Sequence, residues 1–301
     1  MLLTFQKVEF TVDPSTIILT LIWGVAIGCV YILLATGLNL IFGVMKLVNF
    51  AHGQLLMIGA FITYTVAIYS GLNVYIAILV SMAAVAALGI GVERLTFRKV
   101  LGTDKLNEIF VSLGLIYIFE NVAVLTWGDK SKQITSPLSG YSLNLGSMSI
   151  SYDRLSAMLI VVVILIGLSL LVKKTKIGLA MQATSQRSST ATLMGININR
   201  VYMFTFALGA ALASAAGALY GIILPFNYLS GELPTIKAFA IIILGGLGSI
   251  PGAIVGGLLY GVAEQTATLF LGGIWADAVA FALLIIVLII RPTGIFGEKG
   301  E

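Results

Sequence analysis

Residues 173–200, KKTKIGLAMQATSQRSSTATLMGININR, form a basic segment between two long apolar stretches, and this arrangement decides the fold class. The segment contains Lys and Arg but neither Asp nor Glu, and no acidic residue occurs anywhere from Leu155 to Gly231. Flanking positive charges resist translocation, so a basic loop between membrane helices stays on the cytoplasmic side. We therefore expect a multi-pass membrane protein in which residues 173–200 form a cytoplasmic loop.

The basic segment is also patterned like two short helices. Within residues 178–183, GLAMQA, the apolar side chains are spaced to share one helical face. Ser188 and Ser189 are candidate N-caps for the run that follows, and Gly195 fits the left-handed position just past a helix end. Two short amphipathic helices on the cytoplasmic face predict a docking surface for a soluble partner.

The composition indicates a membrane protein before any motif is considered. The chain is 59% hydrophobic and 10% charged, with a mean hydropathy of +1.06, which is outside the range of soluble domains. The net charge of +4 comes mostly from the predicted cytoplasmic loops, so it reports topology and does not indicate a nucleic-acid partner. We expect an all-α polytopic protein, with residues 1–301 forming one transmembrane domain in the lipid bilayer.

Hydropathy predicts long spans and two shorter, interrupted segments. The clear spans are 16–37, 53–70, 72–92, 107–127, 155–172, 201–224 and 274–290. Segments 38–50 and 236–248 are apolar but about 13 residues long, roughly 20 Å as a helix against about 30 Å of hydrocarbon. Each leads through a glycine-containing break, at 49–53 and 248–252, into another apolar run. Such paired interruptions are typical of transporters built from internal repeats, and we expect eight to ten crossings.

The charges predict the direction of each crossing. The basic residues between Arg94 and Lys105 mark a second cytoplasmic loop, and Arg291 indicates a cytoplasmic C-terminus. Residues 128–154 have the mixed charge of an external loop. The short segment 236–248 must then cross the membrane with help from an unwound flank, which is tolerated only where protein or water surrounds it.

Several kinds of chemistry are excluded by what the sequence lacks. It has no Gly-x-x-x-x-Gly-Lys-Ser/Thr motif, so the chain has no phosphate-binding loop of its own. His52 is the only histidine, which excludes a His-paired nucleophile and a multi-histidine metal site. The most embedded acids, Glu120, Glu264 and Asp277, fall toward span ends and do not resemble an ion relay. We expect no enzymatic activity, no metal and no cofactor.

Polar and glycine residues at the two breaks are the candidates for a translocation pathway. These candidates are Asn39, Asn49, His52 and Gly53 at the first break and Gly245, Gly246 and Gly248 at the second. The polar groups could instead only satisfy the backbone freed by the interruption, and we favour that structural role for them. Glu120 should face the bundle interior or an interface, where a structural hydrogen bond is favoured over a substrate contact.

Small residues recur along three of the predicted spans. Gly209, Ala213, Gly217 and Gly221 lie four residues apart, as do Gly24 and Gly28, and residues 252–261 contain a similar set. Such stripes let two helix backbones approach closely. Tight packing inside one subunit is the favoured interpretation, and a dimer seam is the alternative.

Three motifs carry a resemblance to a known family. Residues 37–53, GLNLIFGVMKLVNFAHG, resemble the permease subunits of branched-chain amino-acid ABC importers. Residues 178–183 and 191–200 look like that family's ATPase-coupling loop, and residues 245–252, GGLGSIPG, are similar to its late glycine-rich turn. The first motif points to the histidine-containing permease of the pair. Where the family often has Arg-Ala in the coupling loop, this chain has Gln182-Ala183.

The resemblance implies a fold, a function and a set of partners. It implies a permease like those of type II ABC importers, which forms the translocation pathway in a prokaryotic cell (inner) membrane. Its partners would be a second permease subunit, two cytoplasmic ATP-binding subunits and an extracytoplasmic substrate-binding protein. The substrate would be leucine, isoleucine, valine or a related neutral amino acid. The residues implied to couple the permease to its ATPases are Gly178, Ala183, Arg187, Ala191, Leu193, Gly195 and Ile196.

Other functions remain open from the sequence. An ion-coupled secondary amino-acid carrier would share the broken helices but should contain buried acids. A permease for urea or other small amides would belong to the same family. A channel or structural membrane subunit would have no reason to contain a patterned loop at 178–195.

Overall fold

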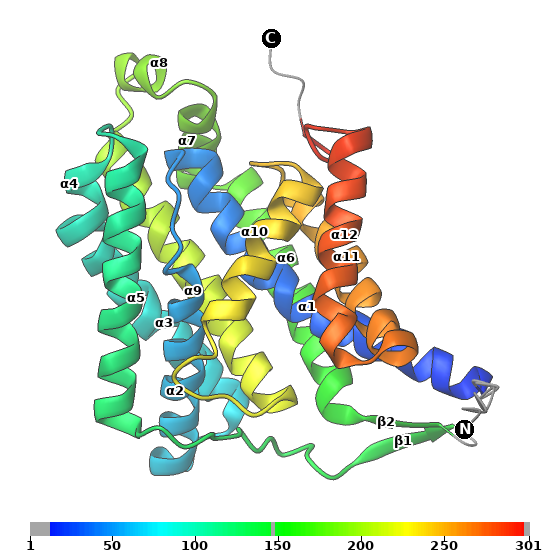
Figure 1. The fold of residues 1–301 in the computed structure, drawn as a ribbon. Helices are drawn as coiled ribbons and strands as arrows, with labels where there is room; N and C mark the ends of the chain where they lie inside the picture. Colours follow the sequence, from blue (N-terminus) through cyan, green and yellow to red (C-terminus); the bar gives the residue numbers. More distant parts are fainter. Residues whose placement is uncertain (1–12, 146–147, 298–301) are drawn as a thin grey trace, which may run out of the picture.

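The computed structural model describes residues 13–145 and 148–297, which form a bundle of helices with a small antiparallel hairpin at one end (Figure 1). The elements are α1 (Pro14–Met45), α2 (His52–Ser70), α3 (Val74–Val92), the π-helical turn η1 (Glu93–Phe97), α4 (Arg98–Val100), α5 (Lys105–Trp127), β1 (Ser142–Leu145), β2 (Met148–Ser151), α6 (Tyr152–Lys174), α7 (Lys176–Gln186), α8 (Ser188–Leu193), α9 (Ile198–Ile223), α10 (Glu232–Gly245), α11 (Ile250–Leu271) and α12 (Gly273–Ile290). Within the described ranges, 8 helices are long and apolar enough to cross a bilayer. This agrees with the predicted all-α architecture of eight to ten crossings.

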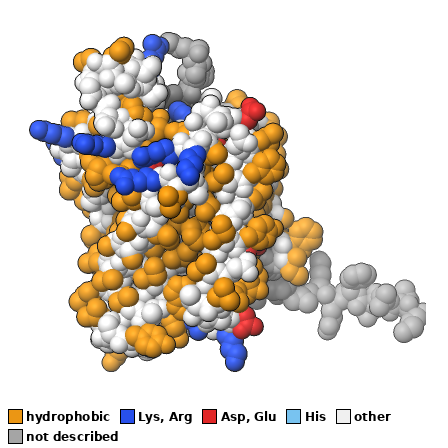
Figure 2. All heavy atoms as spheres, turned by 90° about the vertical axis from the view of Figure 1, so that its left-hand side faces the viewer, with side chains coloured by type: hydrophobic (Ala, Val, Ile, Leu, Met, Phe, Trp, Pro, Cys, Tyr) orange, Lys and Arg blue, Asp and Glu red, His pale blue; other side chains and the backbone are white. Residues whose placement is uncertain are grey.

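The two ends of the bundle differ in charge. Helices α4, α7 and α8 lie at one end, which we call the basic end, and the β1–β2 hairpin lies at the other, the hairpin end (Figure 1). The basic end carries Lys46, Arg94, Arg98, Lys99, Lys105, Lys173, Lys174, Lys176, Arg187, Arg200 and Arg291. Figure 2 shows Lys and Arg side chains gathered near this end above a largely hydrophobic face. The directions of α9, α10, α11 and α12 match those predicted from the charges (Figure 1).

Close helix packing in the core depends on the small-residue stripes. A Cβ added to Gly28 of α1 would lie 3.0 Å from the carbonyl oxygen of Gly257 in α11. A Cβ on Gly37 of α1 would lie 2.7 Å from the carbonyl oxygen of Gly209 in α9. These glycines therefore bring α11 and α9 against α1 within one subunit, as the favoured interpretation predicted.

Helix α1 corrects the prediction of a separate short segment starting at Leu38. It is one continuous helix of 32 residues that ends at Met45, and Lys46 adopts the left-handed conformation with φ +53°. Gly37 does not interrupt the helix, because its role is the close contact with α9. The helix is about 48 Å long at 1.5 Å per residue, and it crosses the bundle obliquely (Figure 1).

Helix α10 corrects the position of the second interruption. Helix α10 begins at Glu232. The non-helical interruption is the stretch that precedes it, residues 224–231. The predicted break at 248–252 is instead a tight turn into α11 at the basic end. Gly246 and Gly248 take φ values of +105° and +87° in this turn, which suit glycine because it has no Cβ.

Residues 173–200, predicted to be a cytoplasmic loop, form the two predicted helices, α7 and α8, with a different start for α8. Ser188 is the first residue of α8, and neither it nor Ser189 caps the helix; Arg187 occupies the N-cap position without a side-chain bond. The cap is found one helix earlier, where Thr175 Oγ1 accepts a hydrogen bond from the Gly178 amide at 3.1 Å. Gly195 is left-handed with φ +82°, as predicted from its place after the helix.

Candidate functional site

Two interrupted helices meet inside the bundle. Residues 46–51 return from the basic end without helical structure, and α2 then begins within the body of the bundle, as α10 does (Figure 1). The starts of α2 and α10 touch, because the Gly53 amide donates a hydrogen bond to Thr235 Oγ1 at 3.0 Å. A Cβ on Gly53 would overlap with Thr235 Oγ1 and the Gly231 carbonyl oxygen. Only glycine therefore allows these two helix starts to approach this closely.

The polar residues at the start of α2 differ in whether their side-chain atoms have hydrogen-bond partners. Asn49 is buried, and its Oδ1 accepts a hydrogen bond from the Ala51 amide at 3.0 Å, so it supports the unwound backbone. His52 is fully buried, and its ring lies against Gly37 of α1. Both ring nitrogens of His52 lack a hydrogen-bond partner in the parts of the chain that the structure describes.

Two carboxylates stand at the same place. Gln54 is buried, and its Nε2 donates a hydrogen bond to Glu120 Oε1 of α5 at 2.9 Å. The carboxyl groups of Glu120 and Glu232 are neighbours, and Glu232 is exposed at the start of α10. The bond from Gln54 gives Glu120 the structural partner that its sequence position predicted. We call the following group the crossing site: His52, Gly53, Gln54, Glu120, Gly231, Glu232 and Thr235.

The other predicted pathway residues lie apart from the crossing site. Asn39 Nδ2 donates to the Ser249 carbonyl, and Asn39 Oδ1 accepts from the Gly248 amide, both at 2.7 Å, so Asn39 holds the α10–α11 turn. Gly245 and Gly246 belong to this same turn. Helix α10 has 14 residues, so about 20 Å separates the turn from the crossing site. The structure thus brings Asn49, His52 and Gly53 together and places Asn39, Gly245, Gly246 and Gly248 at the basic end.

A hollow of about 710 Å³ opens at the basic end beside this turn. It lies between α1, α7, the α10–α11 turn and the segment after α12, and its lining includes Gly43, Gln182, Gly248, Ser249 and Phe296. Asn39, Gly248 and Gln182 also line a smaller recess next to it. The turn therefore borders open space at the end that carries α7 and α8.

A cluster of charges, in which Lys237 and Glu264 are buried and the Asp277 side chain is 43% exposed, is the feature that sequence reasoning missed. Lys237 Nζ of α10 lies 2.8 Å from Glu264 Oε1 of α11 and 2.8 Å from Asp277 Oδ1 of α12. The Tyr31 hydroxyl of α1 lies 3.4 Å from the same Glu264 oxygen. The sequence placed Glu264 and Asp277 toward span ends but did not predict that they share Lys237 as a partner. Lys237 was the available signal, since a lysine inside a short apolar segment requires an acidic partner.

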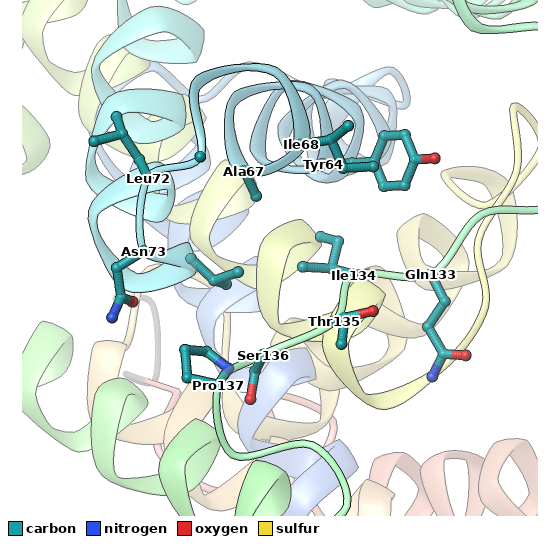
Figure 3. A pocket seen from close by; sticks show the side chains of 12 residues that line it. Tyr64, Ala67, Ile68, Leu72, Asn73, Gln133, Ile134, Thr135, Ser136 and Pro137 are labelled. Atoms are coloured by element: carbon teal, nitrogen blue, oxygen red, sulfur yellow. The ribbon is translucent and has the colours of Figure 1, made fainter.

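A further hollow of about 460 Å³ lies at the hairpin end. Its walls come from the end of α2, the start of α3 and the extended segment 133–137 (Figure 3). Tyr64 and Ile68 of α2 face Gln133 and Ile134 across it. None of the predicted pathway residues lines this hollow.

The predicted coupling residues form a platform that projects from the basic end (Figure 1). Gly178 and Ala191 are buried against the rest of the chain, and Ile196 is half-buried. Ala183 is half-buried and Arg187 is exposed. At the tip of α8, Leu193 is 87% exposed and Met194 is 80% exposed, so α8 ends in an exposed apolar surface.

Comparison with known sequences identifies similar proteins along nearly the whole chain. The profile of a family described as "Branched-chain amino acid transport system / permease component" matches residues 20–288. The chain is 36% identical over 295 residues to the high-affinity branched-chain amino acid transport system permease protein BraD of Pseudomonas aeruginosa, covering 92% of this chain and 95% of that protein. It is 34% identical over 291 residues to the permease protein LivH of Escherichia coli K12, covering 91% and 94%.

More distant similarities extend to a companion permease and to a solved structure. The chain is 26% identical over 303 residues to the permease protein LivM of Salmonella typhimurium, covering 88% of this chain and 67% of that protein. The fold resembles that of PsaBC from Streptococcus pneumoniae in complex with Fab, with a TM-score of 0.50 and 13% identity. That likeness covers 91% of this chain and 92% of the other.

Proposed function

Because this chain belongs to the family of branched-chain amino acid transport system permease components, we propose that it forms part of the translocation pathway of an ATP-driven importer for leucine, isoleucine, valine or a related neutral amino acid. It is a multi-pass membrane permease subunit and not an enzyme. The observation that carries the proposal is the crossing site, where the interrupted starts of α2 and α10 touch inside the bundle. Irregular backbone at such depth is stable only where it is enclosed by protein or borders a water-filled passage.

The basic end is proposed to face the cytoplasm of a prokaryotic cell and to bind two ATP-binding subunits. This orientation follows from the positive charges on the loops at that end. The exposed apolar tip of α8, with Leu193 and Met194, suits insertion into a groove on such a subunit. An extracytoplasmic binding protein would dock at the hairpin end, and a second permease subunit would complete the pathway.

The direct test is import by the assembled complex in liposomes. With its second permease, ATP-binding subunits and binding protein present, the complex should accumulate radiolabelled leucine when ATP is supplied inside. The isolated chain should neither hydrolyse ATP nor accumulate leucine, since it has no nucleotide-binding loop. Uptake by the isolated chain under a proton or sodium gradient would favour an ion-coupled carrier. Import of urea in place of leucine would favour an amide permease.

Replacing Gly195 with Val should uncouple ATP hydrolysis from import. Gly195 has φ +82°, where a β-branched residue is strained by at least roughly 1–2 kcal/mol, so the end of α8 should reorganise. Leucine uptake should fall about tenfold while the amount of protein in the membrane stays normal.

Gly102→Val is the matched control for this coupling experiment. Gly102 lies in the turn before α5 with φ +84°, and like Gly195 it has no other atom within 4 Å of an added Cβ. The two substitutions therefore introduce similar strain at the same end of the molecule, and only Gly195 lies in the proposed coupling loop. Normal uptake in Gly195→Val, or equal losses in both variants, would contradict the coupling role.

A further inference from the structure

The crossing site contains two acidic side chains, Glu120 and Glu232, at a depth where acidic residues are rare. Glu120 precedes Trp127, the last residue of α5, by seven positions, which is about 10 Å along the helix from the hairpin end. Glu232 is the first residue of α10 and starts within the bundle (Figure 1). Both carboxyl groups therefore lie at the depth of the hydrocarbon, where a charge is costly and marks a substrate or ion pathway when it is present.

The exposure of Glu232 restricts what it faces. Its side chain is exposed on the surface of the subunit, on the same side of α10 as Leu233 and Ile236, which are 59% and 50% exposed. A carboxylate at this depth does not face lipid without a large cost, so this side of α10 must border either a water-filled passage or another subunit.

Beside the two carboxylates, the side-chain oxygen of Gln54 has no hydrogen-bond donor among the described residues. Glu232 stands at the uncapped start of α10, where the helix dipole stabilises a negative charge. Gln54 is 1% exposed, and its Nε2 is used by Glu120. Its Oε1 points toward Gly231 at the start of α10 and has no hydrogen-bond donor within residues 13–145 and 148–297. An unpartnered buried acceptor is costly, so it calls for a partner such as an ordered water or a bound ligand.

We propose that Glu120, Glu232 and Gln54 bind the α-ammonium group of the amino acid as it crosses the membrane. An ammonium group has three N–H donors, and the two carboxylates and the free Gln54 Oε1 supply three acceptors at one place. The exposed side chains of Leu233 and Ile236 lie beside Glu232 and provide apolar contact for a branched aliphatic side chain. This inference rests on the proposed function, since it names the part of the substrate that the pathway recognises.

The test uses the complete importer in liposomes with leucine as the probe. Glu232→Gln and Glu120→Gln keep the size of the side chains and one acceptor oxygen, and remove the charge. Losing one charge-assisted hydrogen bond should reduce the maximal import rate roughly 10- to 100-fold. The concentration of loaded binding protein that gives half-maximal import should change less than about twofold, because docking occurs outside the membrane. Glu232→Asp should recover part of the rate.

Controls separate recognition from assembly. Asp104→Asn removes an exposed acid from the turn before α5, outside both the crossing site and the coupling loop, and should import at the normal rate. Each variant should also co-purify with the second permease in normal amounts. Loss of that subunit in Glu232→Gln would mean that the carboxylate makes a subunit contact, and the proposal would be overturned. Normal maximal rates in both Gln variants would also overturn it while leaving the importer function intact. Failure of the unaltered complex to import leucine would instead overturn the function itself.

Discussion

Replacing Lys237 with Met is expected to destabilise the protein by about 3–5 kcal/mol, because breaking a buried ion pair leaves uncompensated charge. Lys237 is 7% exposed and lies within 2.8 Å of carboxylate oxygens from both Glu264 and Asp277. Without the ammonium group, the buried carboxylate of Glu264 and the partly exposed carboxylate of Asp277 would both lose their positively charged partner. Helices α10, α11 and α12 are held together at this point, so their packing should loosen first.

Thermal unfolding in detergent and the yield of assembled complex would measure the effect of Lys237→Met. The matched control is Lys130→Met, which removes an exposed lysine at the hairpin end and should leave the midpoint of unfolding unchanged. A triple variant, Lys237→Met with Glu264→Gln and Asp277→Asn, should recover much of the lost stability, since no net charge remains buried. An unfolding midpoint for Lys237→Met equal to that of the unaltered protein would show that the cluster does not stabilise the bundle.

Replacing Gly53 with Ala should abolish import, because the added methyl group has no room at the crossing of α2 and α10. It would overlap with Thr235 Oγ1 and with the backbone carbonyl of Gly231, and a backbone atom cannot move aside as a flexible side chain would. Overpacking typically costs about 1–3 kcal/mol, and we expect the upper end of that range here. The Gly53 amide would also lose its bond to Thr235 as the helices separate.

Gly114→Ala is the control for Gly53→Ala. Gly114 is also helical, in α5, and an added Cβ there meets nothing within 4 Å. Alanine in an open helical position should stabilise the helix slightly, by roughly 0.5–1 kcal/mol. Leucine uptake and the midpoint of thermal unfolding should therefore decrease in Gly53→Ala. In Gly114→Ala neither should decrease. Normal uptake in both would mean that the close crossing is not required for transport.

Much of the architecture was predictable because it depends on local properties of the chain. The length of each apolar run compared with the bilayer predicted the spans, and Lys and Arg in the loops predicted which elements share an end. Gly195 at a left-handed helix end was predictable for the same reason, since the conformation of one residue depends on its immediate neighbours. The capping prediction at Ser188 was wrong, since α8 begins at Ser188 itself and Arg187 occupies the N-cap position.

The interior of the bundle was decided by contacts between distant residues. Gly53 and Thr235 are 182 positions apart, Gln54 and Glu120 are 66 apart, and Lys237 and Glu264 are 27 apart. No local sequence pattern predicts which glycines contact each other in the folded bundle, or which acidic residue pairs with a buried lysine. The first interruption was predictable from its motif, whereas its counterpart was placed at the wrong end of α10.

The sequence alone therefore determined a polytopic membrane protein, its basic end and its patterned loop, because hydropathy and charge act on each segment separately. The tertiary structure alone decided that residues 224–231 form the second interruption, that Glu120 adjoins Gln54 and Glu232, and that Lys237 joins three helices. The physical reason is that hydrocarbon selects each span by its own apolar length. Buried polar groups must find partners wherever the packed helices bring them, and that pairing exists only in the folded bundle.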